Sequence, residues 1–218
     1  MTRMGCRRVG LILAMCALGA VGHAGPAAAE PVPPVSGPAQ AAGLVDVRTV
    51  VPDAVIDLRY ATADNFVGIA LYPAGARCLV HESLAPGLAT AAAQLRANGE
   101  VLTFWDCYRP HNVQVAMFEH TPDPAWVARP GAYARSHTAG RSVDVTIAGA
   151  DMGTGFDDFT PVATAYATEG VTPAAQANRA RLREAMEAGG FTVYAGEWWH
   201  FDGPGAAQDR PKLDVPIN

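Results

Sequence analysis

Two short segments, far apart in the sequence, place polar side chains of the metal-ligand type among apolar residues. The first runs from Ser136 to Thr146 and contains His137 and Asp144, and the second is Glu197-Trp198-Trp199-His200-Phe201. Burying a carboxylate and an imidazole among aromatic rings without partners costs roughly several kcal/mol. A metal ion with a bound water would compensate both groups. A chain of this kind is therefore constrained to a fold in which the two segments meet.

The spacing within the first segment requires a turn. His137 and Asp144 are seven residues apart, which on a straight strand would point them to opposite faces. A turn at Gly140 allows His137 to fold back beside Asp144. With His200, they supply three protein ligands and leave a fourth position for water, the pattern of catalytic zinc. Alternatively, His137 is a surface histidine and Asp144 caps a turn.

Two further residues suit hydrolytic chemistry at such a metal. The Trp-Trp-His-Phe run favours a strand, so Glu197 would approach from the bend after Gly196 and act as general base toward a metal-activated water. Arg109 follows an apolar run and could stabilise the oxyanion of a tetrahedral intermediate, or simply pair with Asp106.

Asp157 lies in a Gly-rich loop, where a solvated turn is the default interpretation, although it could hold a substrate ammonium.

Length and charge limit the function classes. The 218 residues suffice for one well-buried domain, and 50% hydrophobic with 17% charged residues indicates a globular chain. The net charge of −5, with no Lys/Arg cluster beyond residue 8, disfavours nucleic acid and anionic membranes as partners.

The N-terminus has the pattern of a targeting signal. Arginines precede an apolar run over residues 9–21, which is too short for a membrane span, and Ala27-Ala28-Ala29 offers a cleavage site. Met15 disfavours a lipid anchor on Cys16. We expect a signal peptide at 1–29, a flexible Pro/Ala-rich linker at 30–43, a domain at 44–218, and an exported protein, periplasmic or secreted, with no stable span in its mature form.

Removal of the signal peptide leaves Cys78 and Cys107 as the mature cysteines. An even pair in an oxidising compartment predicts a disulfide. The alternative is two buried free thiols.

The hydrophobic pattern predicts helices alternating irregularly with strands. Helices are expected over 83–97 with Ser83 as N-cap, from Pro110 onward, and over 176–188. Strands are expected over 44–51, 55–60, 101–105, 143–147 and 191–194, with a last one in the Glu197 motif. This order predicts an α+β fold with a mainly antiparallel central sheet flanked by helices.

The chain resembles the D-alanyl-D-alanine dipeptidases of the VanX type from about Val55 to Phe201. Four motifs occur in the order of that family: Asp106-Cys107-Tyr108-Arg109-Pro110, Ser136-His137 through Asp144, Met152-Gly153-Thr154-Gly155-Phe156-Asp157 and Glu197-Trp198-Trp199-His200. The segment from Tyr60 to Phe66 is similar to the family's N-terminal motif. The resemblance implies the fold shared by zinc D,D-peptidases and the Hedgehog signalling domain.

The resemblance also implies roles for individual residues. One Zn²⁺ per chain would be held by His137, Asp144 and His200, with Glu197 as the base and Arg109 as the oxyanion stabiliser. Asp157 would bind the free amine of a D-Ala-D-Ala dipeptide, Ser136 and Tyr60 would contact the substrate, and Asp106 would orient Arg109.

The sequence departs from the family at two positions near the ligands. Arg135 stands where Ser is usual, which bears on recognition of the substrate carboxylate, and Ser142 replaces a usual Ala, a small-for-small change expected to be harmless. Two alternatives to dipeptide hydrolysis are a D,D-carboxypeptidase acting on peptidoglycan stem peptides and a non-catalytic zinc-binding domain of the Hedgehog kind. An amine acceptor at Asp157 argues against the first, and the presence of Glu197 and Arg109 argues against the second.

Overall fold

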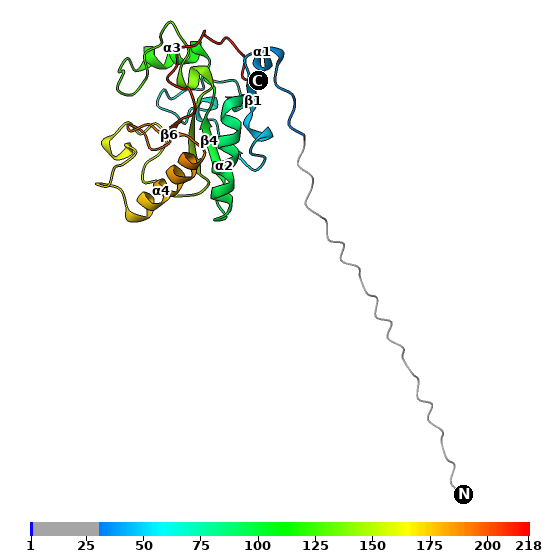
Figure 1. Ribbon diagram of the computed structural model, residues 1–218. Coiled ribbons are helices and arrows are strands. Elements are labelled where there is room, and N and C mark those ends of the chain that lie inside the picture. Colours follow the sequence, from blue (N-terminus) through cyan, green and yellow to red (C-terminus); the bar gives the residue numbers. More distant parts are fainter. Residues whose placement is uncertain (2–30) are drawn as a thin grey trace. The chain divides into compact units, whose positions relative to one another are not determined.

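The structure is a computed structural model that describes residue 1 and residues 31–218 (Figure 1). Apart from its first residue, the expected signal peptide lies outside the described residues, and so does Cys16. Residues 32–218 form one compact unit. No helix in the described part of the chain is long and apolar enough to cross a membrane.

A five-stranded sheet lies at the centre of this unit. Its strand order is β2 (Val55–Ile56), β4 (Leu102–Asp106), β5 (Ser142–Ile147), β7 (His200–Asp202) and β6 (Thr192–Val193). Only the β2–β4 pair of this sheet is parallel, and the other three pairs are antiparallel. Every residue of β4 and β5 is buried. These observations confirm the α+β class with a mainly antiparallel sheet.

The two strands expected nearest the N-terminus are shorter than predicted. β1 (Leu44–Asp46) pairs with β3 (Leu79–His81) in a separate two-stranded sheet. The Asp46 carboxylate accepts a hydrogen bond from the Arg48 backbone N–H, which turns the chain into the 3₁₀ helix η1 (Val47–Thr49). β2 likewise gives way to η2 (Arg59–Ala61). Side-chain capping by Asp46 therefore ends a strand that alternation alone would extend, whereas η2 begins without a side-chain cap.

The three longer helices begin at residues other than those predicted, and only α4 has a side-chain cap at its start. α2 (Ala85–Arg96) begins after Ser83, which is not its N-cap, because Ser83 lies inside η3 (Glu82–Leu84), where its N–H donates to the His81 ring. α3 covers His111–His120. α4 (Pro173–Ala188) begins earlier than predicted because the Thr172 hydroxyl caps its first turn.

Helices α2 and α4 lie side by side (Figure 1). They approach through two glycines: a Cβ on Gly87 would lie 2.2 Å from the Gly189 carbonyl oxygen, and one on Gly189 would lie 2.3 Å from that of Gly87. No side chain fits between these backbones. The pair of glycines therefore fixes how closely the helices pack.

Part of the segment expected to be a flexible linker is packed against the rest of the domain. It contains α1 (Gly37–Ala41), capped by the Ser36 hydroxyl, and Ala39 is fully buried in the core. The Arg77 guanidinium also donates to the backbone carbonyls of Pro33 and Pro34. The prediction of a flexible lead-in over 30–43 is wrong for this part, because its Ala and Pro residues supply apolar contacts and a helix start.

The register of the central strands lines up polar residues in rows. Asp106 of β4 is paired with Asp144 of β5, and Asp144 with His200 of β7. An irregularity in register between Phe104 and Asp106 brings Asp106, not Trp105, opposite Asp144. The next row pairs Ser142 with Asp202. Because alternate residues of a strand share a face, both rows lie on the same side of the sheet.

The predicted disulfide is confirmed. Cys78 and Cys107 are bonded, with their Cα atoms 5.3 Å apart. The bond ties the residue just before β3 to the residue just after β4.

Candidate active site

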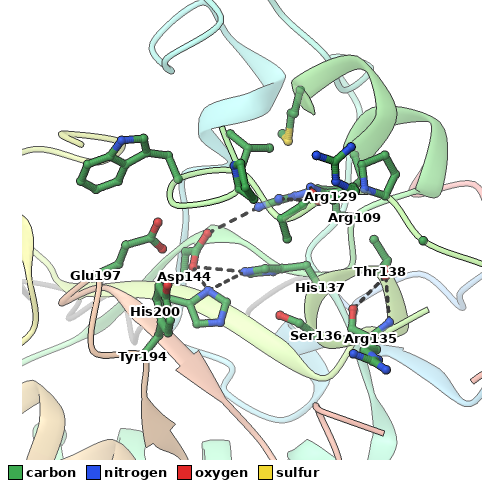
Figure 2. Close-up of a pocket in the computed structure, with 18 of the residues that line it drawn as sticks. Arg109, Arg129, Arg135, Ser136, His137, Thr138, Asp144, Tyr194, Glu197 and His200 are labelled. Carbon is green, nitrogen blue, oxygen red and sulfur yellow. Dashed lines mark hydrogen bonds and ion pairs between the residues drawn. The ribbon is translucent and has the colours of Figure 1, made fainter. Parts of the chain in front are cut away.

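The three predicted ligand residues meet as expected (Figure 2). Asp144 Oδ1 lies 3.2 Å from His137 Nε2 and 3.1 Å from His200 Nδ1, and the two ring nitrogens are 3.1 Å apart. One donor atom from each residue lies within 4.8 Å of the others. His137 is only 5% exposed, which contradicts the alternative of a surface histidine.

The turn at Gly140 brings His137 to Asp144. Residues Ser136–Ala139 form the 3₁₀ helix η4, which ends at Gly140 in the left-handed region with φ of +65°. A Cβ at Gly140 would also lie 2.7 Å from Leu44 Cδ2. Both the backbone conformation and the packing therefore require glycine at this position.

Each histidine has one ring nitrogen that faces the other candidate ligands and one that is hydrogen-bonded outside the cluster. The outside hydrogen bond determines where the ring proton lies. His137 Nδ1 lies 2.8 Å from the Cys107 carbonyl oxygen, which can only accept, so Nδ1 carries the proton and Nε2 presents a lone pair to the site. His200 Nε2 lies 3.1 Å from the Asp202 carboxylate and donates to it, so Nδ1, which lies beside Asp144, is the nitrogen whose lone pair a bound metal would use. Two imidazole lone pairs and a carboxylate oxygen are the donor set that zinc prefers. The residues present therefore fit a bound Zn²⁺.

The electrostatics of the cluster also call for a cation. Burial lowers the pKa of the His200 ring, but its hydrogen bonds to Asp144 and Asp202 outweigh this and raise the pKa to about 10. Burial likewise raises the pKa of Asp144, yet the His137 charge and hydrogen bond bring it below its usual value. Without a metal, the site would therefore take up protons to balance the Asp144 carboxylate.

Glu197 lines the same cavity from the bend between β6 and β7, as predicted. Its backbone N–H donates to the Tyr194 carbonyl at 3.2 Å, and its own carbonyl accepts from the His200 N–H at 3.4 Å. Burial raises the pKa of the Glu197 carboxyl to about 7, and the charge of Asp144 adds to this. A carboxyl with a pKa near neutrality can both accept and return a proton.

Arg109 is held rigidly beside the ligands. Its Nε and Nη2 donate to Asp106 Oδ2 at 2.9 and 2.6 Å, and Nη2 lies 3.8 Å from Asp144 Oδ2. The predicted ion pair with Asp106 is therefore present, and the guanidinium nevertheless lines the cavity. Although burial opposes the charged form, Asp106 raises the pKa of Arg109 well above its usual value, so the group stays charged.

Two supports of Arg109 were missed by the sequence reasoning. Gln114 Oε1 accepts from Arg109 Nη1 at 2.8 Å, and the Tyr72 hydroxyl donates to Asp106 Oδ1 at 2.5 Å. Gln114 could have been suspected, because a polar residue on the apolar face of a helix is usually hydrogen-bonded. Nothing in the sequence marks Tyr72.

Asp157 and Tyr60 lie together at another part of the cavity wall. The Tyr60 hydroxyl donates to Asp157 Oδ1 at 3.1 Å, and the Phe66 N–H donates to Oδ2 at 3.3 Å. Burial, followed by the charge of Asp144, raises the pKa of Asp157 to about 8. Among the described residues, Asp157 (φ 58°) and Ser136 (φ 48°) are the non-glycine residues with positive φ, and both line the cavity.

The cavity has a volume of about 540 Å³. Eight of the predicted site residues line it, and Asp106 lies behind them as the partner of Arg109; the eight are Tyr60, Arg109, Ser136, His137, Asp144, Asp157, Glu197 and His200. Residues 124–133 form a further wall. The side chain of Arg135 is 60% exposed and forms an ion pair with Asp209 at the cavity.

Comparisons with known proteins identify the family of the chain. The sequence profile of the D-ala-D-ala dipeptidase family of peptidases matches residues 40–218. The D-alanyl-D-alanine dipeptidase of Escherichia coli is 38% identical over 169 residues, which cover 75% of this chain and 86% of that protein. The D-alanyl-D-alanine dipeptidase of Streptomyces coelicolor is 32% identical over 186 residues, which cover 74% of this chain and 91% of that protein. The D-alanyl-D-alanine dipeptidase of Enterococcus faecalis is 30% identical over 187 residues, which cover 74% of this chain and 90% of that protein.

Among solved structures, a mutant of the vancomycin-resistance D,D-pentapeptidase VanY in complex with Zn(II) is a distant match. It is 17% identical and has a TM-score of 0.39, over 59% of this chain and 74% of that one. The family assignment depends instead on the sequence profile, which covers most of the chain, and on relatives that are at least 30% identical. The chain belongs to the D-alanyl-D-alanine dipeptidase family of peptidases.

Proposed function

We propose that this protein is a zinc-dependent dipeptidase that hydrolyses D-Ala-D-Ala to two molecules of D-alanine. The observation that carries the proposal is the convergence of His137 Nε2, Asp144 Oδ1 and His200 Nδ1 within 4.8 Å, beside Glu197 and Arg109 in one cavity. These three residues would hold a single Zn²⁺. When bound, zinc supplies a Lewis acid that polarises the peptide carbonyl and makes water more acidic.

Glu197 is the proton carrier of the proposed reaction. With its pKa raised by burial to about 7, the carboxylate takes a proton from the water that attacks the peptide carbonyl. It then returns this proton to the departing amine nitrogen as the C–N bond breaks. One carboxyl thus serves both steps, and the products are a free carboxylate and a free amine.

Arg109 provides fixed positive charge near the reacting carbonyl. Its contacts with Asp106 and Gln114 hold the guanidinium in one orientation, so it needs no rearrangement when charge develops on the carbonyl oxygen. Preorganised donors of this kind stabilise a transition state more than a ground state. Removing one such donor typically costs about 10²- to 10³-fold in kcat.

Asp157 and Tyr60 would receive the free amino group of the dipeptide. A substrate ammonium next to Asp157 would favour the ionised carboxylate, against the burial that raises its pKa. An acceptor at this place selects a free amine over an acylated one. The dipeptide is therefore preferred to a peptidoglycan stem, which continues beyond this nitrogen.

We also propose that the protein acts outside the cytoplasm. The Cys78–Cys107 bond supports this location, because disulfides persist in oxidising compartments.

The decisive experiment measures D-alanine release and metal content on the same samples. The purified mature protein should release D-alanine from D-Ala-D-Ala, lose this activity with a chelator and regain it with Zn²⁺. Glu197→Ala should abolish turnover but retain zinc. Wild-type turnover by this variant would refute the assignment of the base, and preference for N-acylated D-Ala-D-Ala would favour the carboxypeptidase.

A further inference from the structure

The two candidate zinc ligands of the imidazole type are oriented by different acceptors. His137 donates to a buried backbone carbonyl, that of Cys107, whose place is fixed by the main chain. His200 donates instead to the carboxylate of Asp202, whose side chain is 41% exposed. A half-exposed carboxylate is free to turn toward water unless another group holds it.

Ser142 is the group that holds it. The Ser142 hydroxyl donates to the same oxygen, Oδ1, that accepts from His200 Nε2. Ser142 is fully buried, and it is paired directly with Asp202 across β5 and β7. The register of the sheet therefore places the hydroxyl where it fixes one rotamer of the carboxylate. The resemblance to the family predicted only that Ser142 is a harmless replacement of Ala.

We propose that Asp202 is a positioning residue for His200 and that Ser142 holds Asp202 in the orientation this requires. Asp202 keeps the proton of His200 on Nε2, so that Nδ1 remains a lone-pair donor aimed at Asp144 and His137. An anionic acceptor also makes the imidazole a stronger base, and hence a stronger metal ligand, than a neutral carbonyl does. The inference rests on the proposed role of His137, Asp144 and His200 as zinc ligands.

Outer partners of metal-bound histidines typically contribute about 10- to 100-fold to metal affinity. We expect Asp202→Asn to raise the Kd for Zn²⁺ by at least about 10-fold, since an amide is a weaker acceptor and can flip. Ser142→Ala should raise the Kd by a smaller factor, about 3-fold, because it frees the carboxylate without removing it. The measurement is competition between the metal-free full-length mature protein and a chromophoric zinc chelator.

Asp209→Asn is the matched control. The Asp209 side chain is 43% exposed, lines the same cavity and carries the same charge as Asp202, but its partner is Arg135, not a ligand. This variant should keep the zinc affinity of the wild type within about 2-fold. A general electrostatic effect of removing a carboxylate would instead weaken both variants equally.

A second readout separates positioning from simple stabilisation of the fold. If Asp202 acts through the metal, Asp202→Asn leaves the Tm of the metal-free protein within a few degrees of the wild type and reduces the rise in Tm on adding Zn²⁺. A 10-fold weaker site lowers that stabilisation by about 1.4 kcal/mol at saturating zinc. The visible spectrum of the Co²⁺-substituted variant should also shift, because the ring of His200 is no longer held in one orientation.

The outcomes distinguish this inference from the proposed function. If the wild type binds Zn²⁺ tightly and Asp202→Asn matches Asp209→Asn, Asp202 has no positioning role and only the inference fails. A lower Tm of metal-free Asp202→Asn with unchanged zinc affinity also overturns it, in favour of a structural role. If the wild type binds no Zn²⁺, the proposed function itself is wrong.

Discussion

Asp157→Asn should stabilise the metal-free protein at pH 8 much more than at pH 4.5. The pKa of Asp157 is raised to about 8 in the folded protein, mainly by burial, against about 3.9 in an unfolded chain. Between these values the folded state holds a proton that the unfolded state has lost, so the free energy of unfolding falls as the pH rises from about 4 to about 8. Asparagine has no proton to lose and removes this dependence.

The size of the effect follows from the shift. Four pKa units at about 1.36 kcal/mol each give an upper bound of roughly 5.5 kcal/mol. The side chain is only partly buried and accepts hydrogen bonds from Tyr60 and Phe66, so solvent and these donors reduce the effect. We expect a gain of about 2 kcal/mol at pH 8 and well under 1 kcal/mol at pH 4.5.

Urea denaturation of metal-free wild type and variant at a series of pH values measures this difference. Asp158→Asn, the same change at a neighbouring residue that does not line the cavity, is the matched control. The same Asp157→Asn substitution should lower kcat/KM for D-Ala-D-Ala by about 100-fold, because a charged hydrogen-bond partner of the amine is lost. A difference in stability that does not vary with pH would refute the linkage argument, and an equal loss on an N-acylated substrate would refute the amine contact.

Three further substitutions test the scaffold around the site. Replacing both disulfide cysteines with alanine should lower the free energy of unfolding by about 3.5 kcal/mol, because the bond closes a loop with a sequence separation of 29. Urea denaturation without reductant measures this loss, and a value below about 1 kcal/mol would contradict the cross-link argument. Gly87→Ala should destabilise by about 1–3 kcal/mol because its Cβ meets the Gly189 carbonyl, whereas Gly75→Ala, with open space around it, should stay within about 0.5 kcal/mol in the same assay. Gln114→Leu should lower kcat by about 10-fold with zinc content unchanged, as it frees one side of the Arg109 guanidinium; steady-state kinetics that match the wild type would remove Gln114 from the site.

The approach of His137 to Asp144 was predictable because its signal lies within one short segment of the sequence. Gly140 marks the turn that returns His137 to Asp144, and the aromatic run ends in β7, although Trp198 and Trp199 lie in the turn before this strand and only Phe201 of the strand is buried. The strand register that pairs Asp144 with His200 could not be predicted in this way, because it depends on which strands become neighbours. The disulfide was predictable from the expected export and the even number of mature cysteines.

The errors of prediction have a common origin in tertiary packing and side-chain capping. The segment around Ala39 has the composition of a linker, yet the side chain of Ala39 is buried in the core. Alternation predicts a strand beyond Asp46, but the carboxylate of that residue captures the next backbone N–H and starts a turn. Tyr72 supports Asp106 from a loop, a contact between residues 34 apart that no periodicity encodes.

The two described non-glycine residues with a left-handed backbone, Ser136 and Asp157, both line the candidate active site. A non-glycine residue in this region costs about 1–3 kcal/mol and persists only where the surroundings impose it. Ser136 directly precedes His137, whose carbonyl accepts from the Arg109 N–H at 3.0 Å while its ring donates to the Cys107 carbonyl. The positive φ of Ser136 thus places His137 so that its carbonyl holds the backbone of Arg109 while its ring is held by the Cys107 carbonyl. Because both hydrogen bonds depend on where His137 lies, a relaxed backbone at Ser136 would disturb them together.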